Sequence, residues 1–310
     1  MIKPYAYMGV DDLEKLMNFN AQVYGIGGAL GYLHVGDIPH RIYNNLRNFN
    51  PADVVHLWKD ENDTLLAWTI IYPMYPAFDL QIAPQVHGSD IEETILRWLI
   101  QETHQQAQKQ ATLFGNAILT EVSEHDPIRA DLLRKYGFIA PSSPTYIHAH
   151  RPLNQPIPHS PLPEGYIIRP ATGIEDAPQL AQVHAGAFGS RWTTEQYQRF
   201  MESPGYSADH EMVVVAPTGQ FVSFCVYWLD KINGVGLFEP MGTHKDFHRM
   251  GFARALMNET LRYMIRDGMQ VAEITYETDN PPAEALYRSI GFEPMYATSS
   301  YQKALDSIVV

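Results

Sequence analysis

The stretch THKDFHRMGFARALM, residues 243–257, runs from a polar, partly basic loop into an amphipathic helix that we predict over residues 252–266. A helix N-terminus offers backbone N–H groups that have no partner within the helix, at the positive end of the helix dipole. Gly251 and Ala253 would let a phosphate come close to these groups, with Arg249 and Arg254 on either side. On its own the motif leaves a second interpretation open, in which the glycine only eases the turn into the helix.

The composition of the chain narrows the class of protein around this loop. Its 310 residues are about twice the usual length of one domain, so we expect two cores. The net charge is −13, with 22 Lys and Arg against 35 Asp and Glu, which argues against nucleic acid and mildly favours a cationic small substrate. No apolar run approaches the roughly 20 residues that cross a bilayer, so no membrane partner is expected. The start lacks a signal-peptide pattern and Cys225 is the single cysteine, which together predict a cytoplasmic location without disulfides.

The two halves of the chain repeat one pattern. HDPIRADLLRKYGFIAP (125–141) superimposes on DNPPAEALYRSIGFEP (279–294) with an offset of 291 − 137 = 154. Residues 10–19 match residues 174–183 with an offset of 176 − 12 = 164. The difference, 164 − 154 = 10, predicts about ten extra residues in the first half, most easily placed within 24–39.

The middles of the two halves also correspond, since residues 53–72 and 211–230 both read as an apolar β-hairpin. We therefore expect domains over 1–150 and 151–310, the second of which begins with a stiff Pro-rich linker over 151–164. The elements that we predict for the second half are, in order, strand 166–169, helices 175–188 and 194–201, hairpin 211–229, strand 235–243, helix 252–266, strand 271–277, helix 282–290 and strand 296–303.

Two motifs at the predicted helix starts resemble those of the GNAT superfamily of acetyl-CoA-dependent N-acetyltransferases. HRMGFA (248–253) is similar to its Arg/Gln-x-x-Gly-x-Gly/Ala signature, with His248 in place of Arg or Gln. NPPAEALYRSIGF (280–292) is similar to its Asn-x-x-Ala-x-x-Leu-Tyr helix that ends in Gly-Phe. The resemblance covers about residues 165–305 and, through the repeat, the first half more weakly, as in tandem bacterial proteins of this superfamily. It implies an α+β fold of two tandem GNAT-like domains, each a central mixed, mostly antiparallel twisted sheet flanked by helices.

The resemblance also implies acetyl-CoA as co-substrate. The pantetheine arm would pair with the backbone of residues 241–243, and the pyrophosphate would lie on the amides of residues 249–254. Asn280 would contact the cofactor from the opposite side. The cofactor-binding residues implied in this way are Met241, Gly242, Thr243, His248, Arg249, Met250, Gly251, Phe252, Ala253, Arg254, Asn280, Ala283 and Tyr287.

Direct transfer of an acetyl group to an amine needs a base that takes a proton from the ammonium form. Glu239, just upstream of the loop, is the candidate base, with Glu273 and Glu277 in reserve. A strand-end glutamate in a surface ion pair is the alternative for Glu239 and stays open. The resemblance implies that Tyr287 is the general acid that protonates the departing thiolate.

Two further groups receive no catalytic part. Cys225 lies in the apolar run FVSFCVYW, where a small buried apolar residue is expected and not an acyl-carrying nucleophile. His244 and His248 are four residues apart, but no carboxylate completes a ligand set, so no metal site is expected.

The first half lacks these features at the aligned positions. The loops, aligned through Pro84 and Lys245, give an offset of 245 − 84 = 161. With this offset and the offset of 154, the facing pairs are Asp90 with Gly251, Glu92 with Ala253, Phe78 with Glu239, and Leu133 with Tyr287. Since carboxylates oppose a pyrophosphate, we expect residues 1–150 to be a degenerate domain that is structural or shapes the substrate cleft.

The sequence thus predicts an N-acetyltransferase that moves acetyl from acetyl-CoA directly to a primary amine, in the C-terminal domain. The acceptor would be a small-molecule or peptide amine, and the protein a monomer built as a pseudo-dimer of repeats, or a homodimer. Two alternatives remain: a non-catalytic sensor that binds acyl-CoA, and an acyltransferase that uses another acyl group or a hydroxyl acceptor.

Overall fold

The computed structural model of the protein describes residues 2–27, 30–46, 49–109 and 115–307. Residues 28–29, which fall within the predicted extra segment 24–39, lie outside the described residues. Within the described residues no helix is long and apolar enough to cross a membrane.

The described strands form one continuous sheet of twelve strands, in the order β1-β2-β3-β4-β5-β12-β6-β11-β10-β9-β8-β7. The first half contributes β1 (Pro4–Ala6), β2 (Val55–Lys59), β3 (Leu65–Tyr72), β4 (Ala77–Ile82), β5 (Ala117–Ser123) and β6 (Tyr146–Pro152). The second half contributes β7 (Ile167–Pro170), β8 (Glu211–Val215), β9 (Phe221–Asp230), β10 (Val235–Thr243), β11 (Val271–Glu277) and β12 (Glu293–Ala304). The two parallel neighbours are β4 with β5 and β10 with β11, and the other printed pairs are antiparallel.

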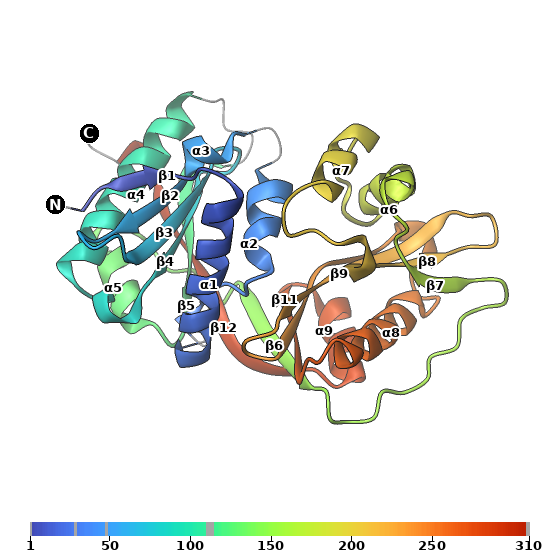
Figure 1. Cartoon of the computed structure of the whole chain (residues 1–310). Coiled ribbons are helices and arrows are strands. Elements are labelled where there is room, and N and C mark those ends of the chain that lie inside the picture. The colour runs from blue at the N-terminus through green and yellow to red at the C-terminus, as the bar shows by residue number, and fades with distance from the viewer. Residues whose placement is uncertain (1, 28–29, 47–48, 110–114, 308–310) are drawn as a thin grey trace.

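The helices lie on both faces of this sheet (Figure 1). In the first half they are α1 (Val10–Gly27), α2 (Asp37–Pro39), which continues into a π-helical turn (His40–Asn45), α3 (Pro51–Val54), α4 (Asp90–Lys109) and α5 (Pro127–Lys135). In the second half they are α6 (Ala177–Phe188), α7 (Thr194–Met201), α8 (Phe252–Arg266) and α9 (Pro281–Ile290). Side chains of α8 and α9 pack in one core of the second half, and those of α6 and α7 pack in another.

The last strand of each half is exchanged with the other half. β12 pairs with β5 along Thr298–Ala304, and β6 pairs with β11 along its whole length. β12 and β6 also pair with each other and thereby close the sheet across the middle. Figure 1 shows the red β12 running from the second half into the first, so that β1 and the end of β12 both lie in the first half. Neither half therefore contains a complete sheet of its own.

The prediction of mixed, mostly antiparallel sheets flanked by helices is confirmed, but the two expected sheets are joined into one. Strand exchange depends on pairing between distant residues, which the repeat pattern does not record. The Pro-rich linker predicted over 151–164 has its first two residues, Arg151 and Pro152, in β6. Arg151 is buried there and donates from Nε to the carbonyl of Ile290 at 2.8 Å, which ties the strand to the end of α9.

The two parallel strand pairs separate soon after they begin. β10 and β11 pair only from Val235–Val271 to Phe238–Ile274, and β4 and β5 pair only at Ala77–Leu119. In β10 the pairing with β9 jumps from Phe238 to Met241, so Glu239 and Pro240 form a bulge. Among the described strands, the divergence leaves the edge of β10 that faces β11 unpaired from Glu239 onward.

Candidate active site

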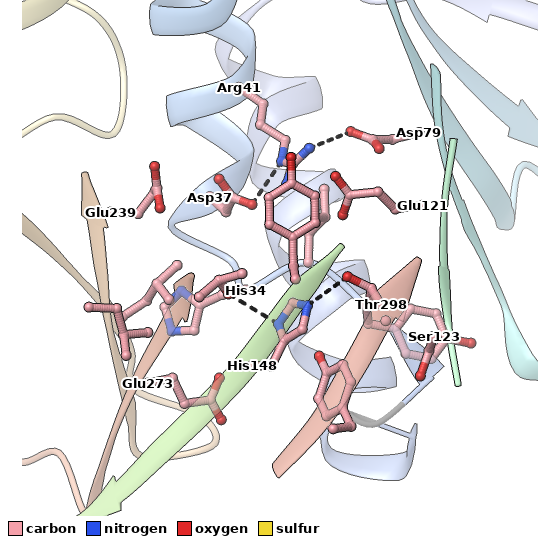
Figure 2. A pocket seen from close by; sticks show the side chains of 18 of the residues that line it. His34, Asp37, Arg41, Asp79, Glu121, Ser123, His148, Glu239, Glu273 and Thr298 are labelled. Carbon is pink, nitrogen blue, oxygen red and sulfur yellow. Dashed lines mark hydrogen bonds and ion pairs between the residues drawn. The ribbon is translucent and has the colours of Figure 1, made fainter. Parts of the chain in front are cut away.

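A cavity of about 600 Å³ lies where the two halves meet, above the central strands of the sheet. Strands of both halves line it, and Tyr24 together with residues of the segment 30–45 forms another wall (Figure 2). Five predicted site residues line this one cavity: Glu239, Met241, Asn280, Ala283 and Tyr287. The cavity thus brings the candidate base, the candidate acid and part of the candidate cofactor groove together.

Glu239 reaches the cavity from the bulge in β10. Its carbonyl accepts a hydrogen bond from Trp228 Nε1 at 2.6 Å, and its side chain is 36% exposed, toward the cavity. Burial by the surrounding protein, together with the charge of Asp37, raises the pKa of Glu239 to about 8, and Arg41 opposes the shift. Such a carboxyl group can exchange a proton near neutral pH, as a general base must.

His40 is the nearest ionisable nitrogen, with Nε2 at 3.7 Å from Glu239 Oε1. Burial lowers the pKa of His40 to about 4, so the imidazole is neutral at pH 7. The contact is therefore not an ion pair, and the surface ion pair considered as the alternative role of Glu239 has no partner among the described residues.

Tyr287 lies on α9 and is 8% exposed. Its ring packs against Tyr276 and Phe292, with centroid distances of 5.6 and 6.3 Å. Burial, with the neighbouring Glu239, raises the pKa of the phenol, so the hydroxyl keeps its proton at neutral pH. A protonated hydroxyl beside the candidate base is a suitable donor to a leaving group.

Asn280 has a structural role in addition to the one that the resemblance implies. It is the N-cap of α9, and its Oδ1 accepts from the backbone N–H of Ala283 at 3.2 Å. The cap sets the start of the helix that carries Tyr287, and Asn280 also lines the cavity.

The start of α8 is open. Gly251 is the N-cap at φ +83° and Arg249 is at φ +64°, so both have left-handed backbone conformations. A Cβ at Gly251 would meet no atom within 4 Å, so the backbone angle, and not a contact, favours glycine here. No side chain among the described residues caps this helix, which leaves first-turn N–H groups available to an anion.

Two basic side chains at this loop differ in what they contact. Arg254 donates one hydrogen bond from Nη1 to the carbonyl of Ser289 at 3.3 Å and is otherwise exposed. His248 binds the carbonyl of Thr243 through Nε2 at 2.9 Å, which ties the loop to the end of β10. His248, which departs from the GNAT signature, therefore stabilises the conformation of the loop in this chain.

The reserve residues have other partners. Glu273 accepts a hydrogen bond from the Tyr24 hydroxyl, and burial raises the pKa of its carboxyl group. Glu277 lies exposed at the end of β11 and lines the cavity. Cys225 is buried with Sγ 3.2 Å from Thr260 Oγ1, and burial raises its thiol pKa to about 12, so it is unsuited as a nucleophile. The described residues contain no group of three or more His, Cys, Asp or Glu placed to hold a metal.

The first half supplies cavity residues that the sequence reasoning missed. Arg41 donates to Asp37 at 2.7 Å and to Asp79 at 2.8 Å, and Asp79 also accepts from the Tyr72 hydroxyl at 2.5 Å (Figure 2). Glu121 on β5 faces the same space. The sequence predicted about ten extra residues in the first half, within 24–39. The types of these residues gave no indication that the segment would lie at this cavity.

The segment that carries Asp37 and Arg41 is attached to the second half. His34 Nε2 lies 3.1 Å from the carbonyl of Val235, and Asn233 Nδ2 donates to the carbonyl of Ala21 at 2.8 Å. A Cβ at Gly36 would lie 2.0 Å from Trp228 Cβ, so this close approach requires glycine. The first half thereby forms part of the cavity that contains Glu239.

Two of the sequence-based facing pairs shift by one residue in the structure. The loop turns at 84–86 and 245–247 agree with the offset of 161, but α4 begins at 90 and α8 at 252, an offset of 252 − 90 = 162. The second-half loop is one residue longer, so Glu92 is the counterpart of Arg254 and not of Ala253, and Asp90 is the counterpart of Phe252 and not of Gly251.

The bulge in β10 shifts a third facing pair, that of Phe78 with Glu239. β3 pairs Ile71 with Phe78 and Thr69 with Leu80, which leaves Asp79 between them. β9 pairs Tyr227 with Phe238 and Cys225 with Met241, which leaves Glu239 and Pro240 between them. Asp79, and not Phe78, is therefore the counterpart of Glu239, and it is held in an ion pair with Arg41. At the other aligned position, Leu133 is fully buried.

In the first half, the protein's own side chains bind the backbone at the start of α4, the helix equivalent to α8. Glu92 is buried and accepts from the Gly88 N–H at 2.5 Å, from His87 Nδ1 at 2.9 Å and from Arg129 Nε. His87 Nε2 also donates to Asp126 Oδ1 at 3.0 Å, and these two carboxylates raise the pKa of His87 to about 9. The Glu92 carboxylate thus binds the loop N–H just before α4, and Ser89 Oγ accepts from the Ile91 N–H in the first turn at 3.2 Å, whereas the second half offers free N–H groups and Arg254 there.

Glu92→Gln is expected to lower the free energy of unfolding by about 3 kcal/mol, because removing one charge from a buried pair strands the other. The Arg129 guanidinium would be left without its counter-ion. Urea denaturation monitored by fluorescence measures the change. The matched control is Glu93→Gln, which breaks a surface pair with Lys135 and should lower the free energy of unfolding far less, because solvent screens exposed pairs. Equal losses in the two variants would contradict the assigned role of Glu92.

Comparison with known proteins agrees with this geometry. Residues 177–292 match the family model described as the acetyltransferase (GNAT) family. Among curated relatives, mycothiol acetyltransferase from Salinispora arenicola is 30% identical over 164 residues, which are 50% of this chain and 53% of that protein. The protein of the same name from Salinispora tropica is 31% identical over 163 residues, 49% of this chain and 52% of that one. The chain therefore spans about half the length of the curated relatives it matches.

Solved structures match nearly the whole chain. A tandem GNAT protein from the clavulanic acid biosynthesis pathway has a TM-score of 0.69 at 16% identity, covering 98% of this chain and 99% of that one. A GCN5-related N-acetyltransferase from Sphaerobacter thermophilus has a TM-score of 0.66 at 16% identity, covering 98% and 96%. At this identity the likeness is one of fold, and it extends the tandem GNAT fold to the first half.

Proposed function

We propose that the protein is an acetyl-CoA-dependent N-acetyltransferase that moves an acetyl group directly to a primary amine bound in the cavity between the halves. The observation that carries the proposal is that Glu239 and Tyr287 line one cavity at the point where β10 and β11 separate. The family of the second half supports acetyl-CoA as the co-substrate.

The open start of α8 fits the pyrophosphate, and the unpaired edge of β10 from Met241 to Thr243 fits the pantetheine arm. The reacting amine would enter from the cavity as the ammonium ion. Glu239 accepts one proton from it, the nitrogen then attacks the thioester carbonyl and gives its second proton to water, and the carbon–sulfur bond breaks. Tyr287 gives its proton to the departing sulfur, and water returns the proton from Glu239 to the phenol. The products are an amide, free CoA thiol and one proton released to water.

Arg254→Glu is expected to weaken acetyl-CoA binding by roughly 10-fold or more, because charge-assisted hydrogen bonds are worth about 1.5–3 kcal/mol. The variant places at α8 the charge that Glu92 places at α4. Isothermal calorimetry measures the dissociation constant. Arg266→Glu, at the far end of the same helix, makes the same change in net charge and should leave binding near that of the wild type. Equal weakening in both variants would remove Arg254 from the binding site.

The first half is assigned a structural role that shapes the substrate cavity. Its equivalent helix start is occupied by Glu92, its counterpart of Glu239 is paired with Arg41, and its counterpart of Tyr287 is Leu133. One active site per chain follows, in the domain that we assign to residues 151–310. A cytoplasmic location and a monomeric or homodimeric state belong to the same proposal.

The test of the function is a screen of amines with acetyl-CoA under thiol detection. The screen includes monoamines, diamines, peptide amines and, because of the name of the curated relatives, mycothiol-related amines. Amine-dependent thiol release supports the proposal. Binding of acetyl-CoA without thiol release would favour the sensor, and release only with alcohols or with longer acyl-CoAs would favour the other acyltransferase alternative.

A further inference from the structure

Glu121 is a carboxylate of the first half that faces the cavity, and the described residues give its side chain no hydrogen-bond or ion-pair partner. It lies on β5 of the first half, and its exposed surface lies along the cavity. Burial by the surrounding protein and the charges of Asp79 and Asp37 raise its pKa to about 7, against the opposing effect of Arg41.

Glu121 and Glu239 lie on opposite sides of the Asp37–Arg41 pair (Figure 2). Arg41 is already shared by Asp37 and Asp79, so it leaves both glutamates without a counter-ion. Both carboxylates are open to the cavity, and a ligand that fills the cavity displaces their water, which is costly unless a cation or hydrogen-bond donors of the ligand satisfy them. The cavity thus has a position in each half, at Glu239 and at Glu121, at which a positive group would be stabilised, and the exposed Glu277 of β11 lines it as a further carboxylate.

His148 and Tyr296 line the same cavity and supply no positive charge to the two glutamates. His148 stacks on Tyr296 with a centroid distance of 4.3 Å and an interplanar angle of 11°. Its two ring nitrogens lie 3.1 Å from Thr275 Oγ1 and 3.3 Å from Thr298 Oγ1. Burial lowers the pKa of His148 to about 4, so the ring is neutral. A neutral, partly aromatic floor suits an uncharged carbon chain that joins two charged ends.

We infer that the acceptor amine carries a second ammonium group, as small diamines and polyamines do, with the reacting nitrogen at Glu239 and the distal ammonium at Glu121. The inference rests on the proposed function, since it names the substrate class of that same site. The volume of about 600 Å³ falls within the range of small-molecule sites. The acceptor is therefore bound by both halves, and only its reacting end belongs to the second half.

The test compares α,ω-diaminoalkanes with n-alkylamines of equal carbon number in the full-length protein with acetyl-CoA. The ratio of kcat/KM for the diamine to that for the matched monoamine should exceed roughly 10 at the best chain length, as expected for a hydrogen bond between charged groups. Glu121→Gln should reduce this ratio to about 1. Glu14→Gln removes an exposed carboxylate on α1 and should keep the wild-type ratio.

A second readout separates this inference from the proposed function. Spermidine is titrated by calorimetry into the wild type and into the Glu121→Gln variant, each saturated with CoA. Binding that weakens by roughly 10- to 100-fold in Glu121→Gln supports the inference even where no amine is acetylated. A wild-type preference ratio near 1, a ratio unchanged in Glu121→Gln, or equal spermidine affinity in both proteins would overturn it, whereas acetylation of monoamines would still leave the proposed function standing.

Discussion

Tyr287→Phe is expected to lower kcat by roughly 100-fold or more, because a positioned general acid contributes about 10²- to 10⁴-fold to the rate. The change removes only the hydroxyl, and the ring keeps its packing against Tyr276 and Phe292. The KM for acetyl-CoA should stay near the wild-type value, since the loss falls on the departing thiolate and not on cofactor binding. Steady-state thiol release at saturating amine measures both constants.

The matched control for this variant is Tyr263→Phe. Tyr263 lies on α8, packs beneath the guanidinium of Arg266 and does not line the cavity. Its substitution should leave kcat within about twofold of wild type, as expected for a surface change away from the site. An unchanged kcat in Tyr287→Phe would show that the thiolate leaves without this hydroxyl, and Tyr287 would then have only a packing role.

Glu239→Gln is expected to lower kcat/KM at pH 8 by roughly 100-fold, the lower end of the usual contribution of a general base. The pKa of Glu239 is raised to about 8, so the fraction of the basic form increases as the pH rises through this value. In the wild type kcat/KM should therefore rise toward pH 8 and then level off, apart from the titration of the amine itself. In Glu239→Gln this rising limb of the pH profile of kcat/KM should be absent. His40 adds no limb above about pH 5, because its pKa is lowered to about 4.

The same amine is used for both proteins, so that its own titration cancels from the ratio of the two pH profiles. Glu273→Gln serves as the comparison, because Glu273 is a reserve carboxylate in the same cavity. Its hydrogen bond from Tyr24 gives it a structural role, and the pH limb should persist in that variant. A limb that persists in Glu239→Gln and disappears in Glu273→Gln would transfer the role of base to Glu273.

Local elements of the second half were predictable because their patterns are local. The apolar stripe that ends before Gly268 predicted α8 over Phe252–Arg266, and α7, β10 and β11 also have their predicted bounds. β12 begins at Glu293, before the predicted strand, because it pairs there with β6, and it extends to Ala304 because it pairs with β5 of the other half. The end of that strand depends on residues that are nearly 200 positions away in the sequence, since 304 − 117 = 187.

The cavity was only partly predictable. Glu239 and Tyr287 could be proposed because the GNAT resemblance supplies positions near known motifs. Arg41 and Glu121 could not, because they line the cavity only through the contact between the halves, and the repeat pattern holds no information on that contact. The counterpart of Glu239 was placed at Phe78 because a constant offset cannot anticipate a bulge, and the bulge makes Asp79 the counterpart.

The starts of α4 and α8 have similar backbone conformations but side chains of opposite charge. Arg249 and Gly88 have similar left-handed conformations, at φ +64° and +73°, so the loops share their turn. At the third helical position, however, the second half has the exposed Arg254 and the first half has the buried Glu92. A free cradle with a cation attracts a phosphate, whereas a cradle filled by a carboxylate repels one.

The central claim is direct transfer of acetyl from CoA to an amine at one site per chain. A single-turnover experiment tests it most directly: the full-length protein is mixed with an equimolar amount of acetyl-labelled acetyl-CoA, chased with amine and quenched at intervals. The account predicts that the label passes to the amine at the rate of thiol release, with no labelled protein, and that Tyr287→Phe slows both together. Label that remains in acetyl-CoA, or that accumulates on the protein before the amine is added, would contradict it.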